Sequence, residues 1–203
     1  MRCEMTDKLN TKEKFRCFGD SPIYIDYHDN EWGRPVHDDR WLFEMLILEG
    51  AQAGLSWITV LKKRQAYREA FDGFDPEKVA LYGEVKIEEL MANEKIIRNR
   101  RKIGAAVVNA RLFLEIQKQY GSFDNFIWGY VDYKPVTGDW EKLEDMPVTT
   151  PVSDKISKDL KKMGFKFVGS TIIYSFMQAV GMVNDHLKSC CVYNEIISEN
   201  NKP

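Results

Sequence analysis

Two cysteines and two histidines stand at spacings that suit a metal ion. His186 and Cys190 are four residues apart, so on a helix their side chains would share one face. Cys17 and His28, near the other end of the chain, would complete a Cys2His2 set of the kind that holds tetrahedral Zn²⁺. Four protein ligands leave no open coordination position. We therefore expect a structural zinc that joins the two ends of the chain, rather than a catalytic one.

The same four residues also have a simpler interpretation. They would then be scattered buried cysteines and two polar histidines, since a His-x3-Cys spacing is a weak signal by itself. Cys3 and Cys191 are two further thiols that could replace either cysteine as a ligand. The spacing alone thus leaves open both the metal site and the identity of its ligands.

A second group of residues suits the binding of a flat ring. Tyr24, Tyr27 and Trp32 crowd the segment SPIYIDYHDNEWG, which we expect to be a loop. Glu49 ends the apolar run LILE, and Trp57 follows eight residues later. Stacking on aromatic rings with hydrogen bonds to the ring edge is how flipped nucleobases are bound, and a carboxylate would favour a cationic base. The alternative is that the aromatic residues are core and Glu49 is a surface acid at a helix end.

A third group is the basic segment KIIRNRRK at 95–102. It lies between a short expected helix at 86–92 and a long one at 99–119. Backbone amides at a helix N-terminus, together with cations, can hold a phosphodiester backbone. The alternative is a solvated helix face. The candidate DNA-binding residues are Lys95, Arg98, Arg100, Arg101 and Lys102.

Helical patterns dominate the rest of the chain. Apolar residues recur at helical spacing over 41–48, 55–71, 99–119, 153–163 and 169–181, and Asp75-Pro76 is a helix start. Strand signals are few, so we expect an all-α protein. A polar connection with three prolines at 135–151 is the best candidate for a domain boundary.

Composition excludes several classes of protein. The 203 residues carry 29 Lys+Arg against 31 Asp+Glu, which is neither a histone-like nor an acidic disordered balance. No apolar run approaches the length of a membrane span, and the four cysteines form no disulfide framework, so we expect a cytoplasmic protein. Motifs for a Walker loop, a dinucleotide site, a serine nucleophile elbow or a catalytic zinc are absent.

Five strings of the sequence closely resemble the family of bacterial DNA-3-methyladenine glycosylases I. They are YHDNEWG (27–33), LFEM…LEG (42–50), QAGLSWITVLKKR (52–64), GFKFVG (164–169) and YSFMQAVGMVNDH (174–186). The resemblance runs from Cys17 to about Cys191. It implies a helix-hairpin-helix DNA glycosylase fold with the hairpin at about 87–108. A single glycosylase domain would occupy 17–192, between a loose extension at 1–16 and a C-terminal tail at 193–203.

The family resemblance also implies roles for individual residues. It places a structural zinc on Cys17, His28, His186 and Cys190. It makes Glu49 the carboxylate that contacts the base, and thus our candidate catalytic residue. Tyr24, Tyr27 and Trp57 match the pocket positions, and Trp32 matches a further aromatic of the pocket region. Two departures stand out: Phe18-Gly19 replaces a tryptophan that often follows the first zinc cysteine, and the spacing from Cys17 to His28 is two residues shorter.

The implied activity is monofunctional base excision. Methylation at N3 makes adenine cationic, so the base leaves readily, and we expect selectivity to come from capture of the extruded cationic ring by Glu49 and the aromatics. Many relatives use an aspartate after the hairpin, but no Asp occurs between 94 and 119, and we assign no general base. We also nominate no lysine nucleophile, which predicts hydrolysis of the N-glycosidic bond without lyase activity.

The expected partner is double-stranded DNA carrying alkylated bases, with free 3-methyladenine as product, and the expected state is a monomer. Two other classes remain in view. One is a non-enzymatic, zinc-stapled DNA-binding module that recognises damaged DNA without a base pocket. The other is a zinc hydrolase of small molecules, which the saturated ligand set disfavours.

Overall fold

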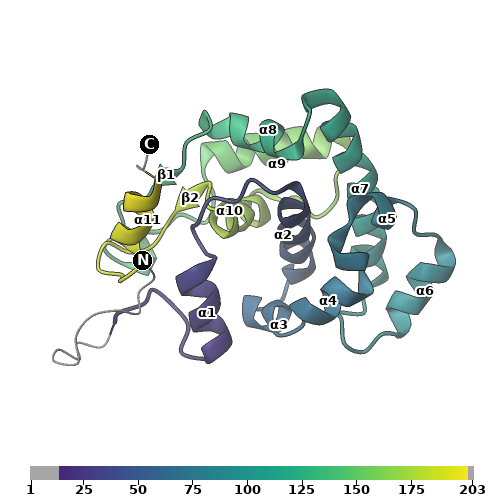
Figure 1. Ribbon diagram of the computed structural model, residues 1–203, viewed down its shortest axis with the longest axis horizontal. Helices are drawn as coiled ribbons and strands as arrows, with labels where there is room; N and C mark the ends of the chain where they lie inside the picture. The colour runs from purple at the N-terminus through teal and green to yellow at the C-terminus, as the bar shows by residue number, and fades with distance from the viewer. Residues whose placement is uncertain (1–13, 201–203) are drawn as a thin grey trace.

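The computed structural model describes residues 14–200 and is mostly helical, as predicted (Figure 1). The α-helices are α1 Pro22–Asn30, α2 Asp39–Gln52, α3 Trp57–Leu61, α4 Arg64–Ala70, α5 Pro76–Ala80, α6 Glu84–Ala92, α7 Arg100–Tyr120, α8 Phe123–Trp128, α9 Pro151–Met163, α10 Ser170–Ala179 and α11 Tyr193–Asn200. Short 3-10 turns occupy Asp72–Phe74, Gly129–Val131 and Leu143–Asp145. Two strands of two residues each, β1 Val136–Thr137 and β2 Val183–Asn184, pair in parallel.

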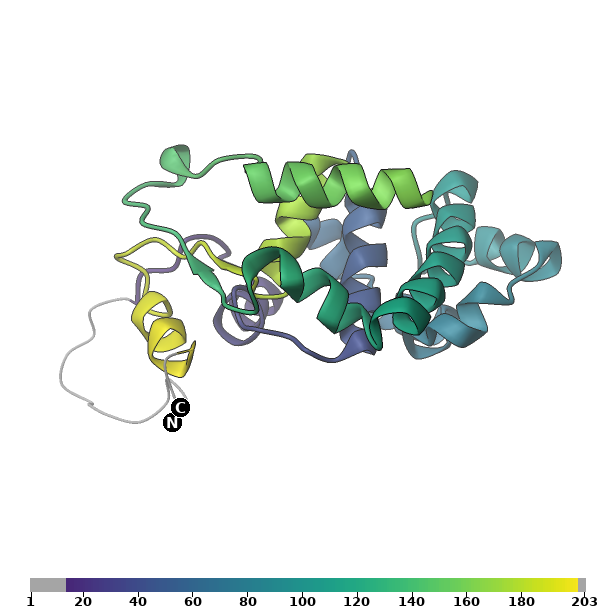
Figure 2. The same ribbon diagram turned by 90° about the horizontal axis from the view of Figure 1, so that it is seen from above.

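Helix α2 is the centre of the fold. The Asp38 side chain caps it by accepting a hydrogen bond from the backbone of Trp41. All residues from Leu42 to Ala51 are buried, as expected for a helix that is surrounded on every side. It contacts α3, α7, α8 and α10, and Figure 2 shows it in the middle of the molecule. Glu49 therefore lies deep in the protein although it is an acid.

Helix α7 confirms the long amphipathic segment predicted over 99–119. The Asn99 side chain caps its first turn, and Gly121, with a φ of 85°, ends it. Its apolar face, including Ile103, Val107 and Ala110, is buried against α5 and α2. The basic residues at its N-terminus thus stand at the junction with α6, where the sequence places them.

Two local expectations were wrong. The segment around Tyr24 and Tyr27 is not a loop, because residues 22–30 form helix α1. Most residues of this helix are polar and only Tyr27 and His28 are buried, so it has no apolar stripe that would indicate a helix. Pro22 at the first helical position was the start signal that we overlooked. The helix predicted over 55–71 is broken at Lys62–Lys63 into α3 and α4.

The first and last described segments lie together, as Figures 1 and 2 show. The backbone of Cys191 donates to the carbonyl of Phe15 at 3.0 Å. Arg34 joins the end of α1 to α11 by contacting Glu195 at 2.9 Å. Residues 1–13 of the predicted loose extension lie outside the described residues, and the predicted tail is helical over Tyr193–Asn200. Within residues 14–200, no helix has the length and apolar character needed to cross a membrane.

Candidate functional site

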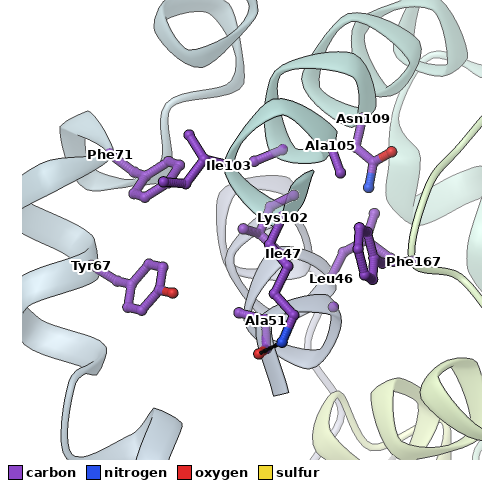
Figure 3. Close-up of a pocket in the computed structure, with 12 residues that line it drawn as sticks. Leu46, Ile47, Ala51, Tyr67, Phe71, Lys102, Ile103, Ala105, Asn109 and Phe167 are labelled. Atoms are coloured by element: carbon purple, nitrogen blue, oxygen red, sulfur yellow. Dashed lines mark hydrogen bonds between the residues drawn. The ribbon is translucent and has the colours of Figure 1, made fainter. Parts of the chain in front are cut away.

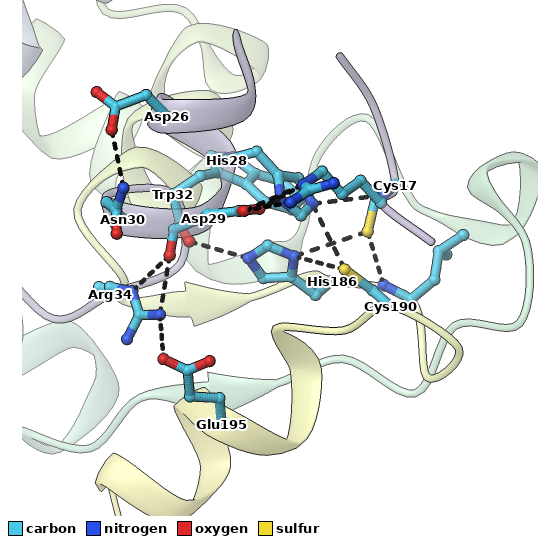
Figure 4. A network of polar contacts seen from close by, with 12 residues as sticks. Cys17, Asp26, His28, Asp29, Asn30, Trp32, Arg34, His186, Cys190 and Glu195 are labelled. Atoms are coloured by element: carbon cyan, nitrogen blue, oxygen red, sulfur yellow. Dashed lines mark hydrogen bonds and ion pairs between the residues drawn. The ribbon is translucent and has the colours of Figure 1, made fainter. Parts of the chain in front are cut away.

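The two cysteines and two histidines that suit a metal come together. One ligand atom from each of Cys17, His28, His186 and Cys190 lies within 4.8 Å of all the others, and all four residues are buried (Figure 4). His186 Nδ1 is 3.7 Å from Cys17 Sγ and 3.4 Å from Cys190 Sγ. His28 Nε2 is 3.5 Å from Cys190 Sγ. The simpler interpretation, scattered core residues, is therefore wrong.

These separations fit a tetrahedral metal. Zinc bonds of about 2.3 Å to sulfur and about 2.0 Å to nitrogen place neighbouring ligand atoms about 3.3–3.8 Å apart. The thiol of Cys17 and the two imidazoles lower the pKa of the Cys190 thiol, which favours the thiolate that a metal needs. The backbone amide of Leu187 donates to Cys17 Sγ at 3.2 Å. The donor set, two sulfurs and two imidazole nitrogens, is one that zinc prefers.

Each histidine of the cluster is oriented by a second hydrogen bond. His28 Nδ1 lies 2.7 Å from Asp29 Oδ1, and that carboxylate also binds the Arg16 guanidinium through Nε at 2.8 Å. His186 Nε2 lies 3.0 Å from the carbonyl oxygen of Trp32. An N–H donated to an oxygen leaves the other ring nitrogen with its lone pair facing the cysteines. This arrangement of outer partners is typical of histidine ligands.

An aromatic pocket of about 170 Å³ lies beside this cluster. It is formed by the segment before α1, by α1 itself, by the last turn of α2, by the start of α3 and by α10. Its lining residues are Phe18, Tyr24, Tyr27, Trp32, Glu49, Gln52, Trp57, Ser175 and Gln178. All five base-binding residues proposed from the sequence are among them.

Aromatic rings form the walls of the pocket. The rings of Tyr27 and Trp57 are 5.4 Å apart and tilted by 50°. Phe18 packs edge-on against Tyr24 at 5.2 Å and against Trp32 at 4.8 Å. Phe18 therefore supplies an aromatic wall at the position where the family often has a tryptophan. Such rings offer flat faces on which another ring can stack.

Polar atoms without partners lie in the same pocket. Among the described residues, only three buried side-chain polar atoms have no hydrogen-bond partner, and two of them are Glu49 Oε2 and Trp57 Nε1. Burial raises the pKa of Glu49 to about 8. Burial, and secondarily the charge of Glu49, also raises the pKa of Tyr24 and of Tyr27. An unpaired buried polar group is costly, so one acceptor and one donor in an aromatic pocket indicate a polar, flat ligand.

Some lining residues were not proposed from the sequence. Phe18 was noted only as a departure, and Gln52 only as a neighbour of Glu49. Ser175 and Gln178 were missed, although two polar residues three positions apart in the apolar segment YSFMQA were a signal for a shared helix face. The side chain of Gln178 is oriented by a hydrogen bond, in which its amide nitrogen donates to the buried carboxylate of Asp185 at 2.8 Å.

The basic turn lies between α6 and α7. The side chains of Lys95, Arg98 and Arg101 are exposed there. Arg100 forms ion pairs with Glu84 and Glu88 of α6. Lys102 alone of the five turns inward, where its ammonium contacts the backbone of α2.

The backbone of this turn is itself held in place. Lys63 Nζ donates to the carbonyl oxygens of Glu94 at 3.1 Å and Lys95 at 3.0 Å. Lys63 lies at the break between α3 and α4, so these contacts join that break to the turn. The hydroxyl of Tyr67 accepts from the amide of Ile97 at 3.3 Å. The backbone that carries the exposed cations is therefore held by hydrogen bonds with the side chains of Lys63 and Tyr67.

A mostly helical fold, an aromatic pocket with a buried carboxylate and a basic turn between two helices define a protein that binds a base from a nucleic acid. The chain belongs to the methyladenine glycosylase family, which it matches over residues 17–193.

Individual relatives agree with this assignment. DNA-3-methyladenine glycosylase 1 of Escherichia coli (strain K12) is 54% identical over 172 residues, which cover 85% of this chain and 92% of the relative. A crystal structure of a 3-methyladenine DNA glycosylase I superimposes with a TM-score of 0.86 at 52% identity, and the match covers 88% of this chain and all of the other. A second crystal structure, of a variant in complex with 3-methyladenine, gives a TM-score of 0.84 at 42% identity, covering 86% and 94%.

Proposed function

We propose that this chain excises 3-methyladenine from alkylated DNA in base excision repair, with the aromatic pocket receiving the extruded base. Its family membership and its similarity to DNA-3-methyladenine glycosylases support this activity. The observation that carries the assignment to this pocket is the buried, unpartnered Glu49 Oε2 among the aromatic walls. No other described side chain combines that burial with a free acceptor in a base-sized space.

The pocket can select a damaged base by its charge. Burial raises the pKa of Glu49 to about 8, so at pH 7 its carboxyl group holds a proton. A 3-methylated adenine in DNA is a cation, and its entry stabilises the ionised carboxylate, which a neutral adenine does not. Tyr27 and Trp57 stack on the ring, and Trp57 Nε1 supplies a donor toward its edge. Extrusion is least costly for a damaged base, and this adds to the selection.

The reaction itself needs little acid catalysis. The cationic base leaves as a neutral molecule, with the electron pair of its bond to C1′ of the sugar. Water then adds at the cationic C1′ and loses a proton to the solvent. Glu49 acts in this proposal by holding the departing base rather than by taking a proton from the water. The chain thus releases the free base and leaves an abasic site.

We assign Zn²⁺ to the Cys2His2 cluster. The ligand separations, the oriented imidazoles and the choice of two sulfurs and two nitrogens support zinc. When bound, the ion supplies structural cross-linking and no open coordination position. Cys17 and His28 belong to the first described segments, whereas His186 and Cys190 follow α10, so the ion would join both ends of the domain.

The turn between α6 and α7 is our candidate helix-hairpin-helix for the DNA backbone. The exposed cations Lys95, Arg98 and Arg101 and the amides at the N-terminus of α7 are suited to phosphate oxygens. We further propose that the chain acts on double-stranded DNA as a monomer in the cytoplasm. The near balance of charge agrees with a local rather than a global DNA-binding surface.

Release of free base from methylated duplex DNA tests the proposal. We expect the wild-type protein to release 3-methyladenine, measured by chromatography of the liberated bases. Glu49→Gln should reduce the affinity for free 3-methyladenine, which is neutral, about 2- to 10-fold, the range for a neutral hydrogen bond, while the affinity for abasic DNA stays the same. Glu115→Gln, an exposed acid of α7, is the matched control and should match the wild type.

Two results would contradict this proposal. Unchanged base binding by Glu49→Gln would remove Glu49 from the site. No base release by the wild type, with DNA binding intact, would favour a non-enzymatic DNA-binding module.

A further inference from the structure

The last turn of α2 leads directly into the base pocket. Glu49 and Gln52 line the pocket from this turn, and Trp57 lines it from the start of α3, with only four residues between the two helices. The carbonyl oxygens at the end of a helix have no partner within the helix. Whatever satisfies these carbonyls also sets the course of the chain between Glu49 and Trp57.

Lys102 satisfies two of these carbonyls. Its Nζ donates to the oxygen of Ala51 at 2.8 Å and to that of Ala53 at 2.7 Å. These two residues flank Gln52, which is the last residue of α2. Figure 3 shows the Lys102 side chain extending from α7 to the end of α2. Lys102 does not line the base pocket itself, because it lies on the other side of α2 among apolar residues such as Ile47 and Ile103.

The environment of Lys102 differs from that of the neighbouring cations. Lys102 is half-buried, whereas Arg98 and Arg101 are exposed. Burial lowers the pKa of Lys102, since part of its hydration is lost. The two carbonyls compensate for that loss, and a cation at a helix C-terminus is further stabilised by the helix dipole. An ammonium held in this way has little freedom to reach a phosphate.

We propose that Lys102 is a positioning residue of the base pocket, which fixes Gln52 and the segment to Trp57 by holding the carbonyls of Ala51 and Ala53. This inference rests on the proposed base pocket. It also assigns Lys102 a role different from DNA binding, for which the sequence groups it with the other cations. Because Lys102 belongs to the first turn of α7, it connects the turn proposed to bind the DNA backbone with the wall of the base pocket.

Binding of free 3-methyladenine separates the two roles, since this ligand carries no phosphate. Lys102→Met removes the ammonium and keeps the aliphatic stem. We expect it to weaken binding of free 3-methyladenine about tenfold, equivalent to about 1.4 kcal/mol, measured by quenching of tryptophan fluorescence. Lys102→Arg keeps the charge and the donors and should recover part of the affinity. Lys118→Met, an exposed lysine of the same helix, is the matched control and should bind like the wild type.

The salt dependence of binding to abasic duplex DNA supplies the second measurement. A residue that neutralises one phosphate contributes about 0.9 to the slope of log K against log salt. Lys102→Met should leave this slope unchanged, whereas Arg98→Ala should reduce it by about that amount. A reduced slope together with unchanged base affinity in Lys102→Met would overturn the inference and make Lys102 a phosphate ligand.

A purely structural role is also distinguishable. If Lys102→Met lowers the melting temperature but binds the free base normally, the positioning role is wrong. If Lys102→Met does not fold, Lys102→Gln retains a polar head that is too short for both carbonyls, and it should also bind the base less tightly. Failure of the wild type to bind free 3-methyladenine would instead contradict the proposed base pocket.

Discussion

The Cys2His2 cluster and the proposed base pocket are neighbours, but their polar groups differ in whether they have hydrogen-bond partners. In the cluster, each imidazole is held by a second hydrogen bond, His28 by Asp29 and His186 by the carbonyl of Trp32. In the pocket, Glu49 Oε2 and Trp57 Nε1 are buried without any partner. Trp32 belongs to both regions, because its backbone serves the cluster and its ring lines the pocket.

This difference distinguishes polar groups whose hydrogen bonds are made within the fold from polar groups that are left to pair with a ligand. In the cluster, the outer ring nitrogen of each imidazole is satisfied by the chain, and the four ligand atoms lie within 4.8 Å of one another, which is a spacing that could hold a metal ion. The pocket leaves a donor and an acceptor unpaired over a space of about 170 Å³. An unpaired buried group lowers stability, so its presence in a folded protein indicates a benefit that comes from binding.

Loss of a cluster ligand should have the largest effect on stability. Cys190→Ala removes one of the four ligands, and we expect loss of the metal and a fall of at least about 4 kcal/mol in the free energy of unfolding. Metal analysis of the purified protein and urea denaturation measure these effects. Cys191→Ala, at the adjacent position outside the cluster, should keep the metal. Equal stability of the wild type with and without a strong chelator would contradict the zinc assignment.

The ionisation of Glu49 should make the free energy of unfolding depend on pH. The pKa of Glu49 is about 8 in the folded protein against an ordinary value of 4.5. Because the folded state keeps a proton that the unfolded state releases between these values, the contribution of Glu49 to stability is highest below about pH 4.5 and falls as the pH rises to about 8. The maximum slope is about 1.4 kcal/mol per pH unit.

Comparison with Glu49→Gln isolates this contribution. The difference in unfolding free energy between the variant and the wild type should grow in favour of the variant from pH 5 to pH 8, since other titrating groups cancel. Chemical denaturation at four pH values measures it. A difference that is constant with pH would show that Glu49 is ionised in the empty pocket.

The smallest effect on base affinity should come from loss of the indole donor of Trp57. Trp57→Phe keeps an aromatic wall but loses the unpartnered donor, so base affinity should fall about 2- to 10-fold, the range for a neutral hydrogen bond. Trp128→Phe is the matched comparison, because its Nε1 donates to the carbonyl of Val36 at 2.9 Å. It should lower stability by about 1–3 kcal/mol and leave base affinity unchanged. The reverse pattern would mean that Trp57 belongs to the core rather than to the site.

The parts of the fold that were predicted correctly are those whose burial pattern is local. Helix α7 has an apolar stripe and a cap, and both can be read from consecutive residues. Helix α1 was missed because only Tyr27 and His28 on it are buried. At the break between α3 and α4, the Lys63 side chain contacts carbonyls of a turn some thirty residues away, and a local pattern does not show such a contact.

The candidate site could likewise be predicted only where the signal lies in neighbouring residues. The four-residue spacing indicates the pair His186 and Cys190, but not for the expected reason, because residues 186–190 form a loop with a turn and a bend rather than a helix. Their meeting with Cys17 and His28 depends on the fold, and the family resemblance was needed to support it. Gln178 enters the pocket through the orientation of α10, and Lys102 has the same charge as the cations beside it. Charge and spacing do not tell which cation points outward and which turns toward α2.

The position of the cluster ligands along the chain also affects synthesis. Cys17 and His28 are made early, and their partners His186 and Cys190 are among the last residues of the domain to be translated. At about 5–20 residues per second, the first pair waits roughly ten to thirty seconds for the second. During that time the thiol of Cys17 and the imidazole of His28 on the nascent chain are accessible to other metals, and the thiol is accessible to oxidants. The cluster is therefore closed only when the ribosome has nearly finished the domain.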